Sequence, residues 1–254
     1  MQNSFRARLL SWALKNLTRA ACQVDDRALI RIPAKGPLIL VSNHINFLEV
    51  PLIYTHLLPR PIAGFAKAEH WRNPPMRFLF ETYGAIPLRR GEADATAIEL
   101  ALAALREGWI FAMAPEGTRS GHGRLQRGRP GVVLLAARSG APIQPMVHYG
   151  GEAIWRNLSR LRRTEFHIVV GNPFFLDEPW ERAAREVRQA IADEIMYQIA
   201  ALLPPSYRGR YADLDKATER YLLFPEGSVS NLHQAGRPWA TAVAGGPAPA
   251  VSLR

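Results

Sequence analysis

Short apolar runs alternate along the chain with longer segments whose apolar residues recur at helical spacing. Each run has the length of a buried strand, and each longer segment shows the i, i+3, i+4 spacing of a helix that packs on a sheet. Strands are predicted at residues 28–32, 38–42, 62–65, 85–88, 109–113, 142–148 and 166–170. Helices are predicted at residues 49–58, 75–83, 92–106, 130–139 and 177–202. This alternation predicts an α/β fold with a mostly parallel or mixed central sheet flanked by helices.

The first segment, residues 4–22, has the pattern of an amphipathic helix with basic borders. A basic helix with a tryptophan on its apolar face suits an anionic membrane surface. A helix packed on its own domain would show a similar pattern, so both interpretations stay open. No apolar run approaches the roughly 20 residues of a membrane-spanning helix. The apolar face contains Phe5, Leu9, Trp12, Ala13, Leu17, Ala20 and Ala21, with Arg6, Arg8, Lys15 and Arg19 on the flanks.

Length and composition indicate one main α/β domain with short additions. The chain has 254 residues, 48% of them hydrophobic, which is enough for a sizeable core. We predict an amphipathic helix at residues 1–24, either membrane-associating or packed on the domain, the α/β domain at residues 25–204, and a C-terminal extension at residues 205–254 whose end is disordered. Cys22 is the only cysteine, so no disulfide can form within the chain and a reducing compartment is the simplest setting.

The basic residues give the chain a formal net charge of +10, and 28 of them are arginines. Such a surface favours phosphates, whether on lipid headgroups, coenzyme A or nucleic acid. Arginine-rich coding in the source genome would produce the same excess. No segment resembles a nucleic-acid-binding module, so we expect no nucleic-acid partner.

A histidine and an acid follow the predicted strand at residues 38–42. His44 lies just beyond this strand, where the backbone is fixed while the ring stays accessible. An imidazole can take a proton from a hydroxyl when an acceptor on its other nitrogen fixes the tautomer. Glu49, five residues further, is a candidate for that acceptor. A solvated histidine at a strand end would show the same pattern, so the pair alone does not decide its role.

A second motif, Ala114-Pro115-Glu116-Gly117-Thr118-Arg119-Ser120, follows the apolar run at residues 109–113. Two further boxes are Gly84-Ala85-Ile86-Pro87-Leu88-Arg89-Arg90 and Ala141-Pro142-Ile143-Gln144-Pro145-Met146. Four boxes in this order form a specific pattern, although each box alone does not. The pattern resembles the glycerolipid acyltransferase family, which includes the lysophosphatidate (1-acylglycerol-3-phosphate) acyltransferases.

The resemblance implies a glycerol-3-phosphate acyltransferase-like fold and the transfer of a fatty acyl group to the hydroxyl of a lysophospholipid in phospholipid biosynthesis. The implied donor is acyl-coenzyme A or acyl carrier protein, and the family's commonest acceptor is 1-acylglycerol-3-phosphate. Other lysolipids and glycolipids are alternative acceptors. The implied location is the cytoplasmic face of a membrane, as a peripheral or monotopic protein. We expect no metal and no cofactor.

The resemblance also implies roles for individual residues. Two adjacent arginines in a strand point to opposite faces, and the family's spacing selects the second of the Arg89-Arg90 pair. The expected catalytic pair is His44 and Glu49. Expected to position the oxyanion or the acceptor are Asn43, Glu116, Gly117 and Thr118. Expected to bind phosphate are Lys67, Arg90, Arg119 and Arg129.

The chain departs from the family's pattern at three positions. Glu49 stands where the family has aspartate, Ala114 where an aromatic residue is usual, and Gly128-Arg129-Pro130-Gly131 where Phe-Lys-x-Gly is frequent. The added methylene of Glu49 requires a different backbone path or rotamer for contact with His44. A lipid- or coenzyme-binding homologue that does not catalyse is therefore an alternative. A serine hydrolase lacks its Gly-x-Ser-x-Gly elbow here, and zinc hydrolysis lacks its His-Glu-x-x-His helix.

Overall fold

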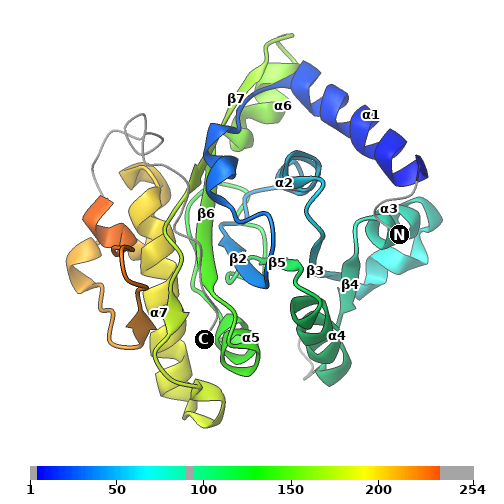
Figure 1. The fold of residues 1–254 in the computed structure, drawn as a ribbon. Coiled ribbons are helices and arrows are strands. Elements are labelled where there is room, and N and C mark those ends of the chain that lie inside the picture. Colours follow the sequence, from blue (N-terminus) through cyan, green and yellow to red (C-terminus); the bar gives the residue numbers. More distant parts are fainter. Residues whose placement is uncertain (1–4, 90–93, 235–254) are drawn as a thin grey trace.

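The computed structural model describes residues 5–89 and 94–234, and within them seven strands form one sheet in the order β1-β7-β6-β2-β5-β3-β4 (Figure 1). Neighbouring strands are parallel except for the antiparallel pair β6–β7. The predicted α/β class with a mostly parallel sheet is therefore confirmed. The strands are β1 (Cys22–Asp25), β2 (Leu38–Ser42), β3 (Ile62–Lys67), β4 (Ala85–Leu88), β5 (Ile110–Met113), β6 (Ile143–Tyr149) and β7 (Thr164–Val170).

Helices cover both faces of the sheet. Successive residues of the central strand β2 point to opposite faces, and both sets are buried under helices. Ile39 and Val41 pack with α4 (Ala95–Arg106), α5 (Gly131–Ser139) and α7 (Arg185–Leu202). Leu38 and Leu40 pack with α2 (Glu49–Leu57) and α1 (Phe5–Ala21). Figure 1 shows α2 above the strands and α4 and α5 below them. Two further helices, α3 (Pro74–Thr82) and α6 (Ile154–Leu158), add Leu79 and Ile154 to the core on the side of α1 and α2.

The strand predicted at residues 28–32 is wrong. Residues Arg27–Arg31 form a 3-10 helix, in which the Leu29 N–H bonds to the Asp26 carbonyl at 3.0 Å. Both edges of β2 are already paired, with β5 on one side and β6 on the other, so a hairpin partner preceding β2 has no place in the sheet. The chain instead contributes β1, directly after α1, as an edge strand paired with β7.

The long C-terminal helix begins at Arg185, later than the predicted start at residue 177. Upstream, the Asp177 N–H bonds to the Tyr221 carbonyl, and the Asp177 carboxylate accepts the indole N–H of Trp180 at 2.7 Å. These bonds hold the chain outside the helical path, next to a small sheet of β8 (Phe175–Leu176) and β9 (Leu222–Leu223). A short 3-10 helix, Trp180–Arg182, and two extended alanines then lead into α7.

The described part of the predicted C-terminal extension packs on α7. The buried Glu194 carboxylate accepts the backbone N–H groups of Arg220 and Tyr221, and Gln198 bonds to the backbone of Asn231. The boundaries near residues 24 and 204 stay predictions, and the predicted disordered end at residues 235–254 lies outside the described residues. Among the described residues, no helix combines the length and apolar character needed to cross a membrane.

Candidate active site

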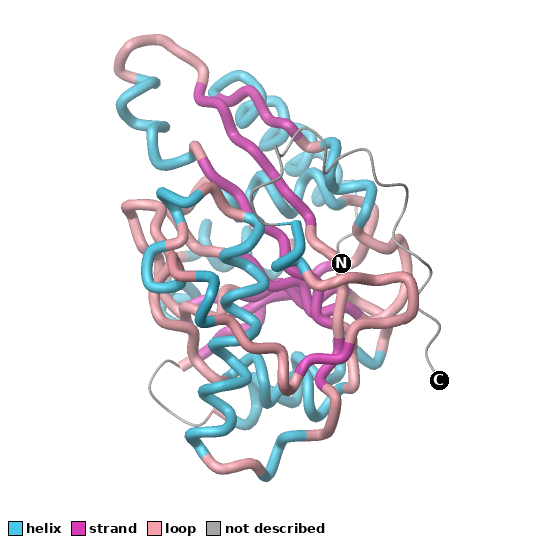
Figure 2. Tube along the Cα trace, turned by 90° about the vertical axis from the view of Figure 1, so that its left-hand side faces the viewer, coloured by secondary structure: helices cyan, strands magenta, loops and turns pink. Residues whose placement is uncertain are grey.

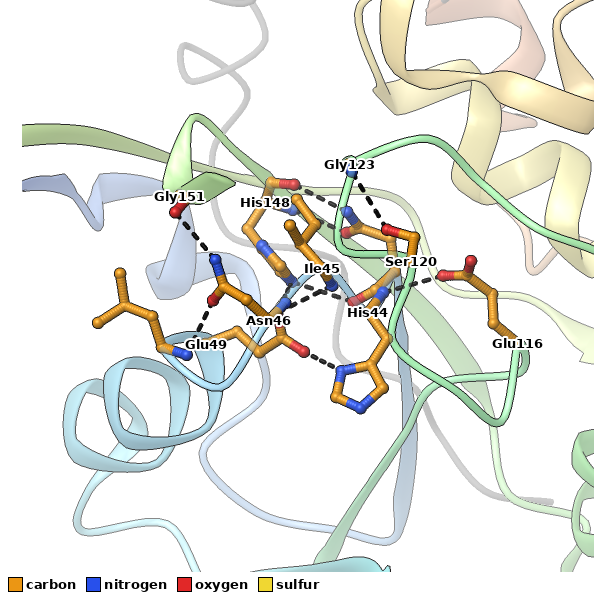
Figure 3. Close-up of polar contacts among 11 residues, drawn as sticks. His44, Ile45, Asn46, Glu49, Glu116, Ser120, Gly123, His148 and Gly151 are labelled. Carbon is orange, nitrogen blue, oxygen red and sulfur yellow. Dashed lines mark hydrogen bonds and ion pairs between the residues drawn. The ribbon is translucent and has the colours of Figure 1, made fainter. Parts of the chain in front are cut away.

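Two parallel neighbouring strands bring the first two motifs together. Val41 of β2 pairs with Met113 of β5, so the loops that leave these strands start side by side. The His44 N–H donates to Glu116 Oε1 at 2.9 Å. The carbonyls of His44 and Ile45 accept the N–H groups of Ser120 and Gly121 at 2.8 and 3.0 Å. Figure 3 shows the two loops joined by these contacts, and the convergence expected from the sequence is thus present in the structure.

The His44 ring is held by Glu49 through its Nδ1 atom, which contacts Glu49 Oε1. Because a carboxylate only accepts hydrogen bonds, this contact places the proton on Nδ1 and leaves Nε2 as an acceptor. The ring is 18% exposed, whereas the Glu49 side chain is buried. Figure 3 shows the ring turned away from the rest of the polar network, with Nε2 facing outward. The geometry is that of a proton acceptor whose tautomer is fixed.

The longer side chain of Glu49 is accommodated at the start of α2. Its second oxygen, Oε2, accepts the backbone N–H groups of Ile45 and Asn46, each at 3.1 Å. The Asn46 side chain fixes the same loop by donating to the Gly151 carbonyl at 2.9 Å and accepting the Leu48 N–H at 2.9 Å. The loop therefore curls around the carboxylate, which offsets the added methylene and keeps Oε1 on the His44 ring.

His148, on β6, is a part of the site that the motifs did not identify. Its Nε2 lies 3.3 Å from Glu49 Oε2 and 3.0 Å from the Asn43 carbonyl. The ring is buried and stacks on Phe166, with centroids 5.3 Å apart. The available signal was a histidine inside a mostly apolar strand, since a buried polar side chain requires a partner.

Asn43 is committed to the same strand. Its Oδ1 accepts the His148 N–H at 3.0 Å, and its Nδ2 donates to the His148 carbonyl at 2.9 Å. Both polar groups of the side chain thus extend the β2–β6 pairing by one residue. This arrangement favours a structural role for Asn43 over the acceptor contact expected from the sequence.

Glu49 is an ionised carboxylate at neutral pH. Burial by itself would raise its pKa, but the interactions with His148, with the His44 ring and with the Asn46 N–H together lower the pKa below its ordinary value. Burial lowers the pKa of His148, which favours the neutral ring, and its Nε2 lies between the Asn43 carbonyl and Glu49 Oε2. The buried Glu49 carboxylate therefore lies between the His148 ring on one side and the His44 ring on the other.

Glu116 ties the second motif to the first rather than facing outward. Its Oε1 accepts the His44 N–H, and its Oε2 accepts the Gln126 N–H at 2.8 Å. Of the two expected tasks, binding acceptor hydroxyls or binding backbone, the structure shows the second. Burial raises the pKa of Glu116 to about 7, against the lowering effect of the two N–H donors.

The pKa of Glu116 predicts a specific pH dependence of stability. Its pKa is about 7 in the folded protein and near the ordinary 4.5 when unfolded, so the folded state binds more protons between these values. The free energy of unfolding should fall by on the order of 3 kcal/mol as the pH rises across this window. Urea unfolding of wild type and Glu116→Gln at pH 5 and pH 8 tests this. A stability difference between the two proteins that is equal at both pH values would contradict it.

Gly117 and Arg129 form one turn. Gly117 has φ +69°, which favours glycine, and a Cβ there would lie 3.0 Å from Arg129 Cδ, so the arginine side chain packs directly over this turn. The Gly117 N–H donates to the Ala114 carbonyl at 3.0 Å and closes the turn, and the expected oxyanion contact of Gly117 stays a prediction. Thr118 is half-buried beside it, and the exposed Arg119 follows.

Three of the four expected phosphate-binding cations are among the described residues, and they lie at the carboxyl edge of the sheet. Lys67 ends β3, and its Nζ lies 3.1 Å from Glu69 Oε1. Arg119 and Arg129 extend from the loops between β5 and α5, and in the described part of the chain neither has an acidic partner. Arg90 lies outside the described residues. Three of the four cations are thus at the edge that carries His44.

Relatives with known names match this chain over the motif region. The family model described as Acyltransferase matches residues 23–149, half of the chain. The lyso-ornithine lipid O-acyltransferase of Pseudomonas aeruginosa is 30% identical over 207 residues, covering 73% of this chain and 78% of that protein. The chloroplastic 1-acyl-sn-glycerol-3-phosphate acyltransferase BAT2 of Brassica napus is 26% identical, over 68% of this chain and 51% of that protein. The chain thus spans about half the length of the Brassica relative.

The fold has a counterpart among solved structures. The crystal structure of the 1-acyl-sn-glycerophosphate (LPA) acyltransferase PlsC from Thermotoga maritima superposes with a TM-score of 0.52 at 22% identity, covering 77% of this chain and 80% of that one. This likeness confirms the fold expected from the four motifs. Together with the family match and the Pseudomonas relative, it completes the assignment: the chain belongs to the Acyltransferase family.

Proposed function

We propose that this protein transfers a fatty acyl group from a thioester to the hydroxyl of a lysophospholipid, with 1-acylglycerol-3-phosphate as the acceptor, in phospholipid biosynthesis. The observation that carries the proposal is the His44 ring, fixed by Glu49 at a strand edge and joined to the second motif through Glu116. The acceptor is taken from the name of the Brassica relative and from the cations near the site.

In the proposed reaction, His44 Nε2 accepts the proton of the acceptor hydroxyl while the hydroxyl oxygen attacks the thioester carbonyl carbon. The carbon–sulfur bond then breaks, and the thiol leaves with the proton that the imidazolium returns. Glu49 keeps the ring oriented and stabilises its cationic form. A thioester is already activated, so no acyl-enzyme is required, and acyl-coenzyme A and acyl carrier protein are both suitable donors.

A membrane surface is the proposed partner, with the protein at its cytoplasmic face as a peripheral or monotopic protein. The outward face of α1 supports this, because its large apolar side chains are exposed while the opposite face packs on α2. Trp12 is 66% exposed at the centre of that face. Such a helix allows the acceptor to enter from the lipid layer. The exposed side chains are Leu9, Trp12 and Leu17, and the packed ones are Leu10 and Leu14.

A lyso-ornithine lipid is the second candidate acceptor. The Pseudomonas protein that carries this name aligns with 73% of the chain, more than the Brassica protein does. Ornithine contains no phosphate, so this acceptor would leave the cations near the site without that ligand. The two candidate acceptors therefore differ in whether they carry a phosphate, and substitution of the cations near the site can test this difference.

An acceptor panel tests the proposed function. Purified protein is incubated with lysophosphatidate, lyso-ornithine lipid and other lysolipids, each with acyl-coenzyme A and with acyl carrier protein donors, and products are identified by mass spectrometry. We expect a diacyl product from lysophosphatidate. Binding of lipid or coenzyme A without product from any combination would favour the non-catalytic homologue, and product only from lyso-ornithine lipid would reassign the acceptor.

Replacing Arg119 and Arg129 should selectively weaken use of a phosphate-bearing acceptor. Arg119→Gln/Arg129→Gln removes two cations near the site, and we expect the KM for lysophosphatidate to rise roughly tenfold per lost phosphate contact. The KM for a phosphate-free acceptor should change little. Steady-state kinetics with both acceptors measure the two values.

Arg106 provides the matched control. It is an exposed arginine at the end of α4, which leads into the start of β5, so it lies at the opposite edge of the sheet from His44. Arg106→Gln should leave the KM for lysophosphatidate within about twofold. Equal increases in KM in the control and in the double variant would assign the effect to general surface charge. Such a result would contradict phosphate binding by Arg119 and Arg129.

A further inference from the structure

The connection from α6 to β7 exposes large apolar side chains at its tip. Residues 154–163, called the α6 loop below, include Trp155 at 64% exposed and Leu161 at 95% exposed, with Leu158 also exposed. Figure 1 places α6 and β7 at the top of the molecule, and in Figure 2 this connection again projects at the top. Large apolar residues gathered on a projecting tip indicate a surface that contacts something apolar.

Leu161 has a backbone conformation that glycine usually supplies. Its φ is +53°, in the left-handed region that leucine rarely occupies. The turn is closed by bonds from the Leu161 N–H to the Leu158 carbonyl and from the Arg162 N–H to the Asn157 carbonyl. The effect is to hold the leucine side chain outward at the end of the loop, where no part of the described chain covers it.

The charge of the α6 loop matches an anionic surface. Four arginines and no acidic residue occur between residues 154 and 163. Arginines that flank exposed tryptophan and leucine side chains are the composition of segments that lie in the headgroup region of a membrane. A protein partner would require acidic and apolar groups in a matching arrangement, whereas an anionic lipid surface offers both over any area. The arginines are Arg156, Arg160, Arg162 and Arg163.

The α6 loop is attached to α1, the other exposed apolar element. Arg163 Nη2 donates to the carbonyls of Arg19 and Cys22, both at 2.6 Å, at the C-terminal end of α1. A cation at this end also complements the helix dipole. The two elements therefore meet at one end of the molecule, where Figure 1 shows the end of α1 beside α6.

The base of the α6 loop adjoins the active-site loop. The Trp155 ring contacts the ring of the exposed Phe47, with centroids 5.6 Å apart, and Phe47 lies three residues after His44. Asn46 donates to the Gly151 carbonyl just before α6. A surface that contains the α6 loop and α1 thus reaches the loop that carries His44.

We propose that the α6 loop is a second membrane-contacting element, which inserts Leu158 and Leu161 into the headgroup region of an anionic bilayer while Arg156, Arg160 and Arg162 bind lipid phosphates. The inference rests on the proposed function, in which the acceptor is a membrane lipid. With α1, the loop forms one docking surface beside His44. An acceptor would then pass from the lipid layer to the imidazole without crossing bulk water.

A probe at the tip tests insertion directly. Cys22, the one cysteine of the chain, is buried, so a cysteine introduced as Leu161→Cys can be labelled selectively with an environment-sensitive fluorophore. Vesicles of phosphatidylcholine with phosphatidylglycerol should shift the emission to the blue, and phosphatidylcholine vesicles should shift it much less. The same probe at Leu223→Cys, on β9, should not respond. Equal responses at the two positions, or none at 161, would overturn the proposal.

Vesicle affinity provides the second test. Leu158→Ser/Leu161→Ser should weaken sedimentation with anionic vesicles at least tenfold, because two apolar side chains lose a buried environment. Leu223→Ser/Val229→Ser removes two exposed apolar side chains elsewhere and should bind as wild type does. An affinity loss equal in both variants, or absent from the α6 loop variant, would reject the proposal.

The activity assay separates this inference from the proposed function. With a short-chain lysolipid dissolved in water, Leu158→Ser/Leu161→Ser should turn over at the wild-type rate. With the lysolipid embedded in vesicles, its rate should fall in parallel with the lost affinity. If wild type is inactive toward both forms of the substrate, the proposed function fails whatever the vesicle-binding results show.

Discussion

His44→Ala should lower kcat/KM for acyl transfer by roughly 10²- to 10⁴-fold, the range expected for a positioned proton acceptor. The ring is the one group in the described site whose free nitrogen faces outward while its other nitrogen is fixed by a carboxylate. Its removal takes away the imidazole that would accept the proton of the acceptor hydroxyl. Product formation measured by mass spectrometry, with the donor near saturation and the acceptor well below its KM, gives the size of the loss.

His122 provides the control for this prediction. It lies in the loop between β5 and α5, which also carries Glu116, and it is exposed; its Nδ1 accepts the Arg124 N–H at 3.1 Å. His122→Ala should retain activity within about twofold. Wild-type turnover by a folded His44→Ala protein would contradict the assignment of the base, as would equal losses in the two variants.

Glu49→Gln should lower the rate of acyl transfer nearly as much as removal of the His44 ring. The amide can no longer accept from His44 Nδ1 and from both loop N–H groups with the same geometry, so the tautomer and the cationic form of the ring lose their support. Conversion of the corresponding carboxylate to an amide in a serine protease triad lowers kcat by about 10⁴-fold, which sets the upper limit here. The loss should appear in kcat, with the acceptor KM within about threefold of wild type.

Glu49→Asp tests the length of the side chain separately from the charge of its carboxylate. The loop of this protein is built around the longer glutamate, so the aspartate keeps the charge but cannot contact both the His44 ring and the Ile45 and Asn46 N–H groups. We expect an intermediate rate, about tenfold below wild type. A faster Glu49→Asp enzyme would show that glutamate impairs this site. An unchanged kcat in Glu49→Gln, with the melting temperature preserved, would remove Glu49 from the mechanism.

The central strands were predictable from the sequence because they are buried on both faces. A strand such as β2, with Leu38, Ile39, Leu40 and Val41 all buried, requires a continuous apolar run that few other structures produce. Strand β4 at Ala85–Leu88 agrees with the prediction to the residue. The helices between the strands follow from their spacing, and their limits differ from prediction where bonds to distant segments intervene, as at Asp177.

The missed elements depend on partners that the local sequence does not contain. Residues 28–32 have a strand's composition, but both edges of β2 are taken by β5 and β6. Strand β1 at Cys22–Asp25 is short and only partly apolar, and it exists because β7 offers an edge directly after α1. Helix α6 has a single turn and lacks the repeat that would identify it.

The convergence of His44 and Glu116 was predictable because the carboxyl ends of adjacent parallel strands meet at one edge. The contacts that hold Glu49 Oε2 could not be predicted from the sequence. They depend on how residues 43–48 curl around the carboxylate and on the position of His148 in β6. Gly117 was assigned an oxyanion role from its motif, yet its N–H closes the turn. The roles of Thr118, Lys67 and the arginines stay predictions.

A double-mutant cycle tests most directly whether His44 and Glu49 act as one unit. The rates of acyl transfer are measured for wild type, His44→Ala, Glu49→Gln and the double variant, with each protein's melting temperature recorded. Because Glu49 acts through the ring, the double variant should be no slower than His44→Ala alone. If the two losses multiply in the double variant, the carboxylate acts independently of the imidazole and the proposed pair is wrong.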